Sequence, residues 1–227
     1  MHPKVVIVYG PPGAGKGTQA NLLADIFGFI HFDTGKYIER LVHDPAHQDD
    51  PVIRKERENF DSGRICTPSW VLQQSRKKAL YLTGSGFGVV FSGSPRSEFE
   101  AFGDADHEGL LAAYEKAAGK ENIVSFLLHV KPETSILRNS KRLLCSLCGI
   151  GIMGGNYSGD TCPRCASPLH RRSLDVPDVI KVRLQKYEEM TFPIIAGMKE
   201  RGYSVRDIDG EPPPHEVFKA IQSALSE

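Results

Sequence analysis

The chain has 227 residues, enough for one α/β domain with insertions or two small domains, with a substantial core. Lys plus Arg and Asp plus Glu number 28 each, so the formal net charge is zero and gives no support for binding to nucleic acid or acidic membrane. No run approaches the roughly 18 apolar residues that span a bilayer. The first apolar run leads into a motif rather than a cleavage site, so we expect a cytoplasmic protein.

Strands and helices are expected to alternate along the chain. Residues 4–10 form a short β-branched run typical of a buried parallel strand, and the helix after it should stop at Gly28. Further strands are expected at 29–32, 88–91, 122–130 and 203–209, and further helices at 68–82, 108–120, 132–144, 176–202 (bent near Pro193) and 214–225. This order predicts an α/β fold with a five-stranded parallel sheet flanked by helices, which binds ligands at the carboxyl ends of its strands.

Two stretches interrupt the alternation. Residues 34–67, called the insertion below, are helical and polar in character. Residues 145–165 contain four of the five cysteines and are rich in Gly. Both are expected to be additions to the core.

A phosphate-binding loop is predicted directly after the first strand. Residues 10–20 read GPPGAGKGTQA, in which Gly10, Gly15 and Lys16 have the spacing of a P-loop. Glycines let backbone N–H groups curl round an anion, the helix that follows directs its positive end there, and Lys16 adds a full charge. The alternative is an ordinary Gly/Pro-rich turn, but strand, loop and helix occur in the required order.

The end of this motif carries a family resemblance. Gly17 follows Lys16 and the hydroxyl comes next, at Thr18; this ending resembles the nucleoside monophosphate kinases, and the adenylate kinases most closely. The resemblance implies reversible transfer of a phosphoryl group from ATP to a nucleoside monophosphate (NMP), with AMP favoured and Mg²⁺ required. It further implies a monomer, and the balanced charge and the lack of a long apolar run predict no nucleic-acid or membrane partner. The expected division is core with P-loop at 1–33, NMP-binding insertion at 34–67, core at 68–137, zinc-binding lid at 138–175 and core at 176–227.

The resemblance also assigns residues to the two nucleotides. Arg40 matches a family arginine only if the turn before it is remodelled, because Glu39 stands at the expected position. Arg96, in the segment GSPRS, is expected to grip the NMP phosphate with its guanidinium fork. The expected ATP-binding residues are Gly13, Ala14, Gly15, Lys16, Gly17, Thr18, Arg138 and Arg142, and the expected NMP-binding residues are Thr34, Gly35, Arg40, Ile65, Gly93, Arg96, Glu100, Arg172 and Arg183.

Catalysis is expected to rest on positive charge. Arg138 and Arg142 lie four residues apart and are expected on one helical face. Because the charge of a transferring phosphoryl group is spread over its oxygens, positioning and electrostatic stabilisation supply most of the rate. The expected catalytic residues are Lys16, Arg96, Arg138, Arg142, Arg172 and Arg183.

Three residues depart from the family pattern near the expected magnesium. Ser92 and Lys36 stand where the family has carboxylates that hold magnesium-bound waters, and Asp33 appears in the same turn as Lys36. One hypothesis is that Asp33 takes over part of the magnesium shell. The other is that Asp33 and Lys36 form an ion pair and magnesium handling is weakened.

Glu100 departs from the family at the acceptor base. The family has a glutamine there, whose amide can both donate to and accept from adenine. An ionised Glu100 only accepts, which suits guanine, or cytosine through its amino group. The alternative is that Glu100 turns to solvent and the backbone reads adenine. We expect AMP as the acceptor because the other family motifs are those of adenylate kinases.

The cysteines predict a structural zinc site. Cys145 and Cys148 form one C-x-x-C pair, Cys162 and Cys165 form another, and thirteen residues separate the pairs. Four thiolates favour Zn²⁺ and leave no open coordination position. The metal would stabilise a lid too small to have its own core. A redox dithiol, or free thiols, would be the alternatives.

Two other functions remain open from the sequence. The lost carboxylates and the displaced arginine would also suit a nucleotide-binding relative with little catalysis, although retention of six cations favours an enzyme. The cysteine segment could belong to a zinc ribbon that binds nucleic acid, but residues 149–161 contain no Lys or Arg.

Overall fold

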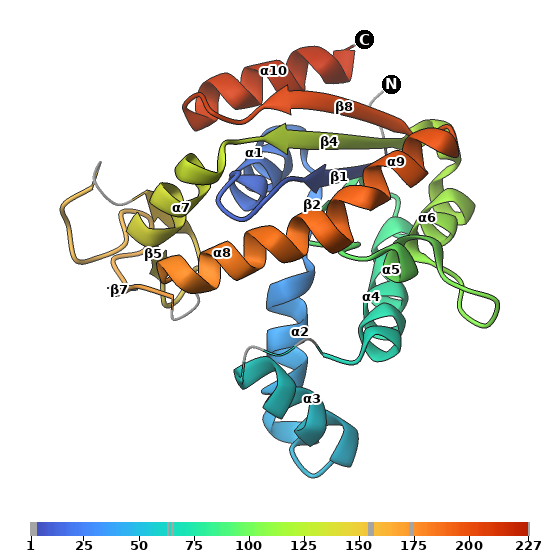
Figure 1. The fold of residues 1–227 in the computed structure, drawn as a ribbon, viewed down its shortest axis with the longest axis horizontal. Coiled ribbons are helices and arrows are strands. Elements are labelled where there is room, and N and C mark those ends of the chain that lie inside the picture. Colours follow the sequence, from blue (N-terminus) through green and yellow to red (C-terminus); the bar gives the residue numbers. More distant parts are fainter. Residues whose placement is uncertain (1–3, 63, 65, 154–156, 173–174, 227) are drawn as a thin grey trace.

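A computed structural model describes residues 4–62, 64, 66–153, 157–172 and 175–226 of the chain. A parallel sheet with strand order β2-β3-β1-β4-β8 forms its centre (Figure 1). Its strands are β1 Val5–Tyr9, β2 Ile30–Asp33, β3 Val89–Ser92, β4 Ile123–His129 and β8 Ser204–Asp209. The five predicted strands are thereby confirmed.

Helices cover both faces of this sheet. Successive residues of β1 are fully or almost fully buried and point alternately into two core clusters, Val6 and Val8 into one and Val5 and Ile7 into the other. Helices α1 and α10 cover the first face, and α4, α6 and α9 cover the second. The helices of the core are α1 Lys16–Phe27, α4 Pro68–Thr83, α5 Glu98–Phe102, α6 Leu110–Ala118, α7 Pro132–Lys141, α8 Pro177–Lys186, α9 Phe192–Glu200 and α10 Pro214–Ser226.

The expected bend near Pro193 is a π-helical segment. The chain runs from α8 through Tyr187–Thr191 into α9 with helical backbone throughout. Proline lacks the N–H that an α-helix needs at that position. The backbone N–H of Phe192 donates to the carbonyl of Tyr187, five residues earlier. The chain therefore forms one continuous helical element over residues 177–200.

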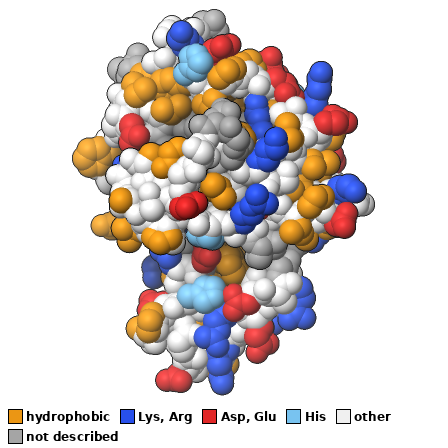
Figure 2. Space-filling view, turned by 90° about the vertical axis from the view of Figure 1, so that its left-hand side faces the viewer, with side chains coloured by type: hydrophobic (Ala, Val, Ile, Leu, Met, Phe, Trp, Pro, Cys, Tyr) orange, Lys and Arg blue, Asp and Glu red, His pale blue; other side chains and the backbone are white. Residues whose placement is uncertain are grey.

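The insertion contains α2 Thr34–Val42, a 3₁₀ turn at Pro45–His47 and α3 Pro51–Asp61. It projects from the sheet as a separate lobe (Figures 1 and 2), and acidic and basic side chains are interspersed over it on the face shown in Figure 2. Its own apolar cluster includes Ile38, Val42 and the lone Cys66. Burial raises the pKa of the Cys66 thiol to about 11, which makes it a packing residue rather than a nucleophile.

A second, small sheet lies in the cysteine-containing segment, and Cys145 is the last residue of one of its strands. Its antiparallel strands, in the order β6-β5-β7, were not predicted from the sequence. They are β5 Arg142–Cys145, β6 Gly151–Met153 and β7 Leu169–His170. The placement of Arg138 and Arg142 on one helical face is therefore wrong, because α7 ends at Lys141 and Arg142 pairs with Met153 in the sheet.

Candidate active site

The P-loop connects β1 to α1 and is held in place by α7. The ammonium of Lys16 donates to the carbonyls of Gly10 (2.7 Å) and Pro11 (2.8 Å), so it lies within its own loop. A Cβ at Gly13, whose φ is +80°, would lie 2.6 Å from the amide nitrogen of Asn139. Only glycine allows this close approach, which fixes the loop against α7.

Positive charges from distant parts of the chain converge on this loop. The pKa of Lys16 is lowered to about 7, first by burial and then by three neighbouring cations, Arg96, Arg183 and Arg142. Burial also lowers the pKa of Arg183 to about 10, with contributions in the same direction from Arg172, Arg142 and Arg96. The structure thus brings together five of the six predicted catalytic cations. Such a cluster favours the binding of an anion with several charges.

Asp175 orients two of these arginines. Its carboxylate accepts two hydrogen bonds of 2.7 and 3.0 Å from different nitrogens of Arg142, and a third, of 3.3 Å, from Arg183. The Asp175 side chain is only 3% exposed. A buried carboxylate with two guanidinium groups keeps both in fixed directions without neutralising the cluster.

Arg138 has a different position from the other arginines. Its guanidinium donates to the backbone carbonyls of Gly210 (2.7 Å) and Glu211 (2.6 Å), in the loop after β8. Arg138 is therefore held beside the loop that leads from β8 into α10. Ser135 lies one turn earlier on the same helix, α7. The hydroxyl of Ser135 in turn donates to Pro12 of the P-loop.

A second group of residues forms the expected acceptor side. The guanidinium of Arg96 lies over Gly93 and Gly35, because Cβ atoms added there would be 3.1 and 3.4 Å from its Nη2 atom. Thr34 is 4% exposed, and its hydroxyl has no hydrogen-bond partner among the described residues. A buried hydroxyl beside a guanidinium is suited to an anionic ligand.

One predicted acceptor residue, Arg40, is not brought to this place. Arg40 is exposed, and its side chain makes no hydrogen bond or ion pair within the described part of the chain. Helix α2 begins at Thr34 with Asp33 as its N-cap, which leaves Arg40 facing solvent. Ile65 lies outside the described residues.

Glu100 is buried rather than turned to solvent, so that alternative is wrong. Its Oε2 atom accepts hydrogen bonds from the backbone N–H of Arg96 (2.9 Å) and the hydroxyl of Ser94 (3.2 Å). Burial raises the pKa of this carboxyl, while the bond from Arg96 lowers it. Glu100 therefore stabilises the turn that presents Arg96.

The position of the missing family carboxylate is occupied by a hydrogen-bonded chain. The hydroxyl of Ser92 and Nε2 of His31 share a hydrogen bond of 2.7 Å, and Nδ1 of His31 shares another of 2.7 Å with Asn21. Burial lowers the pKa of His31. No motif predicts this hydrogen-bonded chain, because its members come from separate elements of the fold.

Asp33 lies at the end of β2, beside Ser92 in the sheet register. Its Oδ1 atom accepts from the backbone N–H of Lys36 at 3.2 Å, and its charge raises the pKa of Lys16. The ion pair with Lys36 that the second hypothesis proposed does not form, since that ammonium donates to the carbonyl of Gly149. A carboxylate close to the P-loop lysine fits an ion that prefers oxygen ligands and keeps several waters, as Mg²⁺ does.

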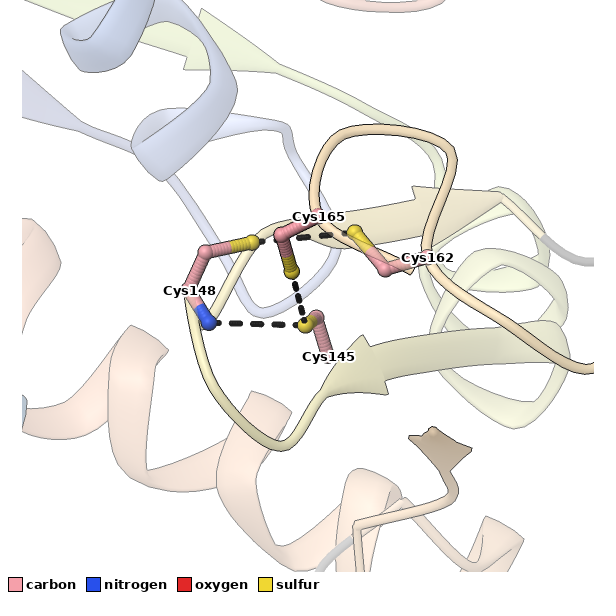
Figure 3. Close-up of side chains that lie close together, drawn as sticks. All are labelled: Cys145, Cys148, Cys162 and Cys165. Carbon is pink, nitrogen blue, oxygen red and sulfur yellow. Dashed lines mark hydrogen bonds between the residues drawn. The ribbon is translucent and has the colours of Figure 1, made fainter. Parts of the chain in front are cut away.

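The four lid cysteines converge as a metal site requires (Figure 3). Their sulfur atoms all lie within 4.8 Å of one another, with Cys145 and Cys165 at 3.4 Å and Cys148 and Cys162 at 3.7 Å. Tetrahedral Zn²⁺ with Zn–S bonds of about 2.3 Å would separate its sulfurs by about 3.8 Å. Backbone N–H groups of Leu147 and Cys148 also point to the sulfur of Cys145. The cluster therefore fits zinc.

The parallel sheet, the loop after β1 and the converging cations define a P-loop nucleotide-binding protein. Comparison with known proteins agrees, since residues 9–142 match the AAA-domain family. An adenylate kinase of Chlamydia pneumoniae is 32% identical, with 97% of each chain covered. An adenylate kinase of Clostridium botulinum is 29% identical over 97% of each chain, and one of Chlamydia trachomatis is 28% identical over 99% of this chain and 91% of its own. The chain belongs to the adenylate kinase family of phosphotransferases.

In the described residues, no helix combines the length and the apolar character needed to cross a membrane.

Proposed function

We propose that this chain transfers the γ-phosphoryl group of ATP to AMP, giving two ADP, and that it does so as a cytoplasmic monomer. The observation that carries the proposal is the convergence of Lys16 with Arg96, Arg142, Arg172 and Arg183. A protein that only binds one nucleotide would need fewer cations close to one another. Five neighbouring cations can stabilise the negative charge of a phosphoryl group while it passes between two nucleotides.

The two nucleotides would bind on opposite sides of this cluster. Gly13, Ala14, Gly15, Gly17 and Thr18 would hold the phosphates of ATP, with Lys16 reaching the β- and γ-phosphates. Arg138, which α7 holds against the loop after β8, would contact ATP. Thr34, Gly35, Gly93 and Arg96 would hold the acceptor phosphate, with Arg172 and Arg183 between the two nucleotides.

Mg²⁺ bound with ATP would neutralise charge on the β- and γ-phosphates. Asp33 would hold part of its water shell, since it lies beside Ser92 in the sheet register and its charge acts on Lys16. Its N-cap hydrogen bond uses only Oδ1, so Oδ2 is left for the water shell of the metal.

The lid, residues 138–175, would close over the insertion to exclude water, since an open site would hydrolyse ATP. The cysteines would hold Zn²⁺ as a structural ion within that lid.

The test is a coupled assay of ATP with AMP, GMP, CMP and UMP, with zinc and magnesium dependence measured on the same preparation. We expect turnover with AMP to exceed that with the other three acceptors. Tight ATP binding without turnover would instead identify a nucleotide-binding relative that has lost catalysis.

A substitution at Glu100 separates its two possible roles. We expect Glu100→Gln to keep the preference for AMP and to lower kcat/KM by less than about tenfold, because the amide oxygen can accept the same two bonds. The acceptor panel on both proteins measures this. GMP turnover in the parent that equals or exceeds AMP turnover, and falls in the variant, would assign base reading to the carboxylate.

The low pKa of Lys16 gives a dependence of ATP affinity on pH. With a pKa of about 7, this lysine is largely neutral at pH 8 in the free protein, and bound phosphates would raise its pKa. ATP binding at pH 8 should therefore take up a proton, and affinity should fall as pH rises above about 7. Titration calorimetry in two buffers of different ionisation enthalpy measures the uptake. Equal heats in both buffers would contradict it.

A further inference from the structure

Lys36 is at an unfavourable position for its own helix. Asp33 is the N-cap of α2, so Lys36 is the third residue of the helix, in its first turn. The N-terminus of a helix carries partial positive charge, and the third position favours Glu or Gln. A lysine there weakens the helix locally. Residues that break a local rule in this way are often retained for an interaction elsewhere.

The side chain of Lys36 crosses to the lid. Its ammonium donates to the backbone carbonyl of Gly149 at 3.1 Å, across 113 positions of sequence. Gly149 directly follows Cys148 and has a φ of +66°, a backbone conformation that favours glycine. A Cβ at Gly149 would lie 2.9 Å from the ammonium nitrogen and 3.4 Å from the carbon beside it. The lysine therefore packs directly against a backbone that has no side chain.

Both ends of this contact are held in place. The backbone N–H of Lys36 is bonded to Asp33 at 3.2 Å. The backbone N–H of Gly149 donates to the carbonyl of Cys145 at 3.1 Å. This bond closes residues 145–149, called the cysteine turn below. In the part of the chain that the structure describes, no other hydrogen bond or ion pair joins residues 34–67 to residues 138–175. A single charged donor thus connects the insertion to the cysteine turn.

We propose that Lys36 is a positioning residue that holds the lid closed on the insertion during phosphoryl transfer. The proposal rests on the proposed function, since closure matters because two nucleotides meet beneath the lid. The contact forms only when the cysteine turn reaches α2. It therefore stabilises the closed state without touching the reacting atoms. The cysteine turn then has two roles, to fold the lid and to present the Gly149 carbonyl to α2.

The test is Lys36→Met, which keeps the length of the side chain and removes the donor. Fluorophores attached through unnatural amino acids at the exposed Val52 of the insertion and the exposed Ser158 of the lid report closure by energy transfer. With saturating ATP and AMP, we expect the ratio of closed to open molecules to fall about tenfold. The KM values for both nucleotides should rise by a similar factor. The kcat should change by less than about threefold, because loss of the contact does not slow the opening of the lid that releases products.

Two further variants provide the controls. Lys36→Arg keeps a charged donor and should restore closure and KM. Lys55→Met removes a lysine from exposed α3 and should leave both unchanged. An unchanged closed fraction in Lys36→Met overturns the proposal, as does a large loss of kcat at normal closure, which would place Lys36 on the phosphates. If the parent closes on nucleotides but shows no AMP turnover, the proposed function fails, and the energy-transfer comparison still tests Lys36.

Discussion

Replacing Lys16 with methionine is expected to lower kcat/KM by about 1,000-fold while leaving the fold intact. The ammonium lies within the P-loop, on the carbonyls of Gly10 and Pro11, and it is the one cation of the cluster that the loop itself contributes. When ATP binds, phosphate oxygens would replace those carbonyls. Methionine fills a similar volume, so the loss should fall on transition-state stabilisation rather than on packing.

The measurement is steady-state turnover with ATP and AMP, together with thermal unfolding of both proteins. Lys77→Met is the matched control, because Lys77 is exposed on α4, away from the P-loop, and its removal should change neither quantity. The melting temperature of Lys16→Met should equal or slightly exceed that of the parent, because burial and the neighbouring arginines disfavour the charged form of Lys16. A Lys16→Met variant that keeps more than about one tenth of the parent activity would show that the arginines alone stabilise the transferring group.

Local patterns predicted the core well. The P-loop, the five strands and most helices follow from short apolar runs, glycine stops and one motif, all of which act within a few residues. The C-x-x-C pairs likewise predicted the convergence of four sulfurs. These features succeed because the residues that determine them are neighbours in the sequence.

Other parts of the site depend on contacts between distant residues. The sequence placed Arg142 on a helix, because nothing near it shows that β5 would pair with β6 instead. It left Lys36 and Asp33 as possible partners, because they are three residues apart, whereas Lys36 bonds to Gly149. The chain from Asn21 through His31 to Ser92 likewise needs two strands and a helix in register. Side-chain direction across elements is set by packing, which a single sequence does not display.

The lid should depend on its cysteines for folding. We expect Cys162→Ser to lose zinc on dialysis against a chelator that leaves the parent with about one zinc per chain. Cys162 is 2% exposed, and its sulfur also accepts a bond from the backbone N–H of Arg164. The lid sheet has short strands and few buried apolar residues, so without the metal it should unfold and take Arg142 out of the site. AMP turnover should fall by at least about 100-fold.

Cys66→Ser is the control for this substitution. Cys66 is buried outside the lid, with its thiol donating to the carbonyl of Glu56, so zinc content and turnover should stay close to those of the parent. ATP binding provides a second distinction. The P-loop is held by the core and by α7, so Cys162→Ser should bind ATP within about tenfold of the parent affinity even when turnover is lost. Zinc retention with normal turnover in Cys162→Ser would contradict a structural metal site. Loss of ATP binding together with turnover would mean that the lid stabilises the P-loop as well, and that the core and lid fold as one unit.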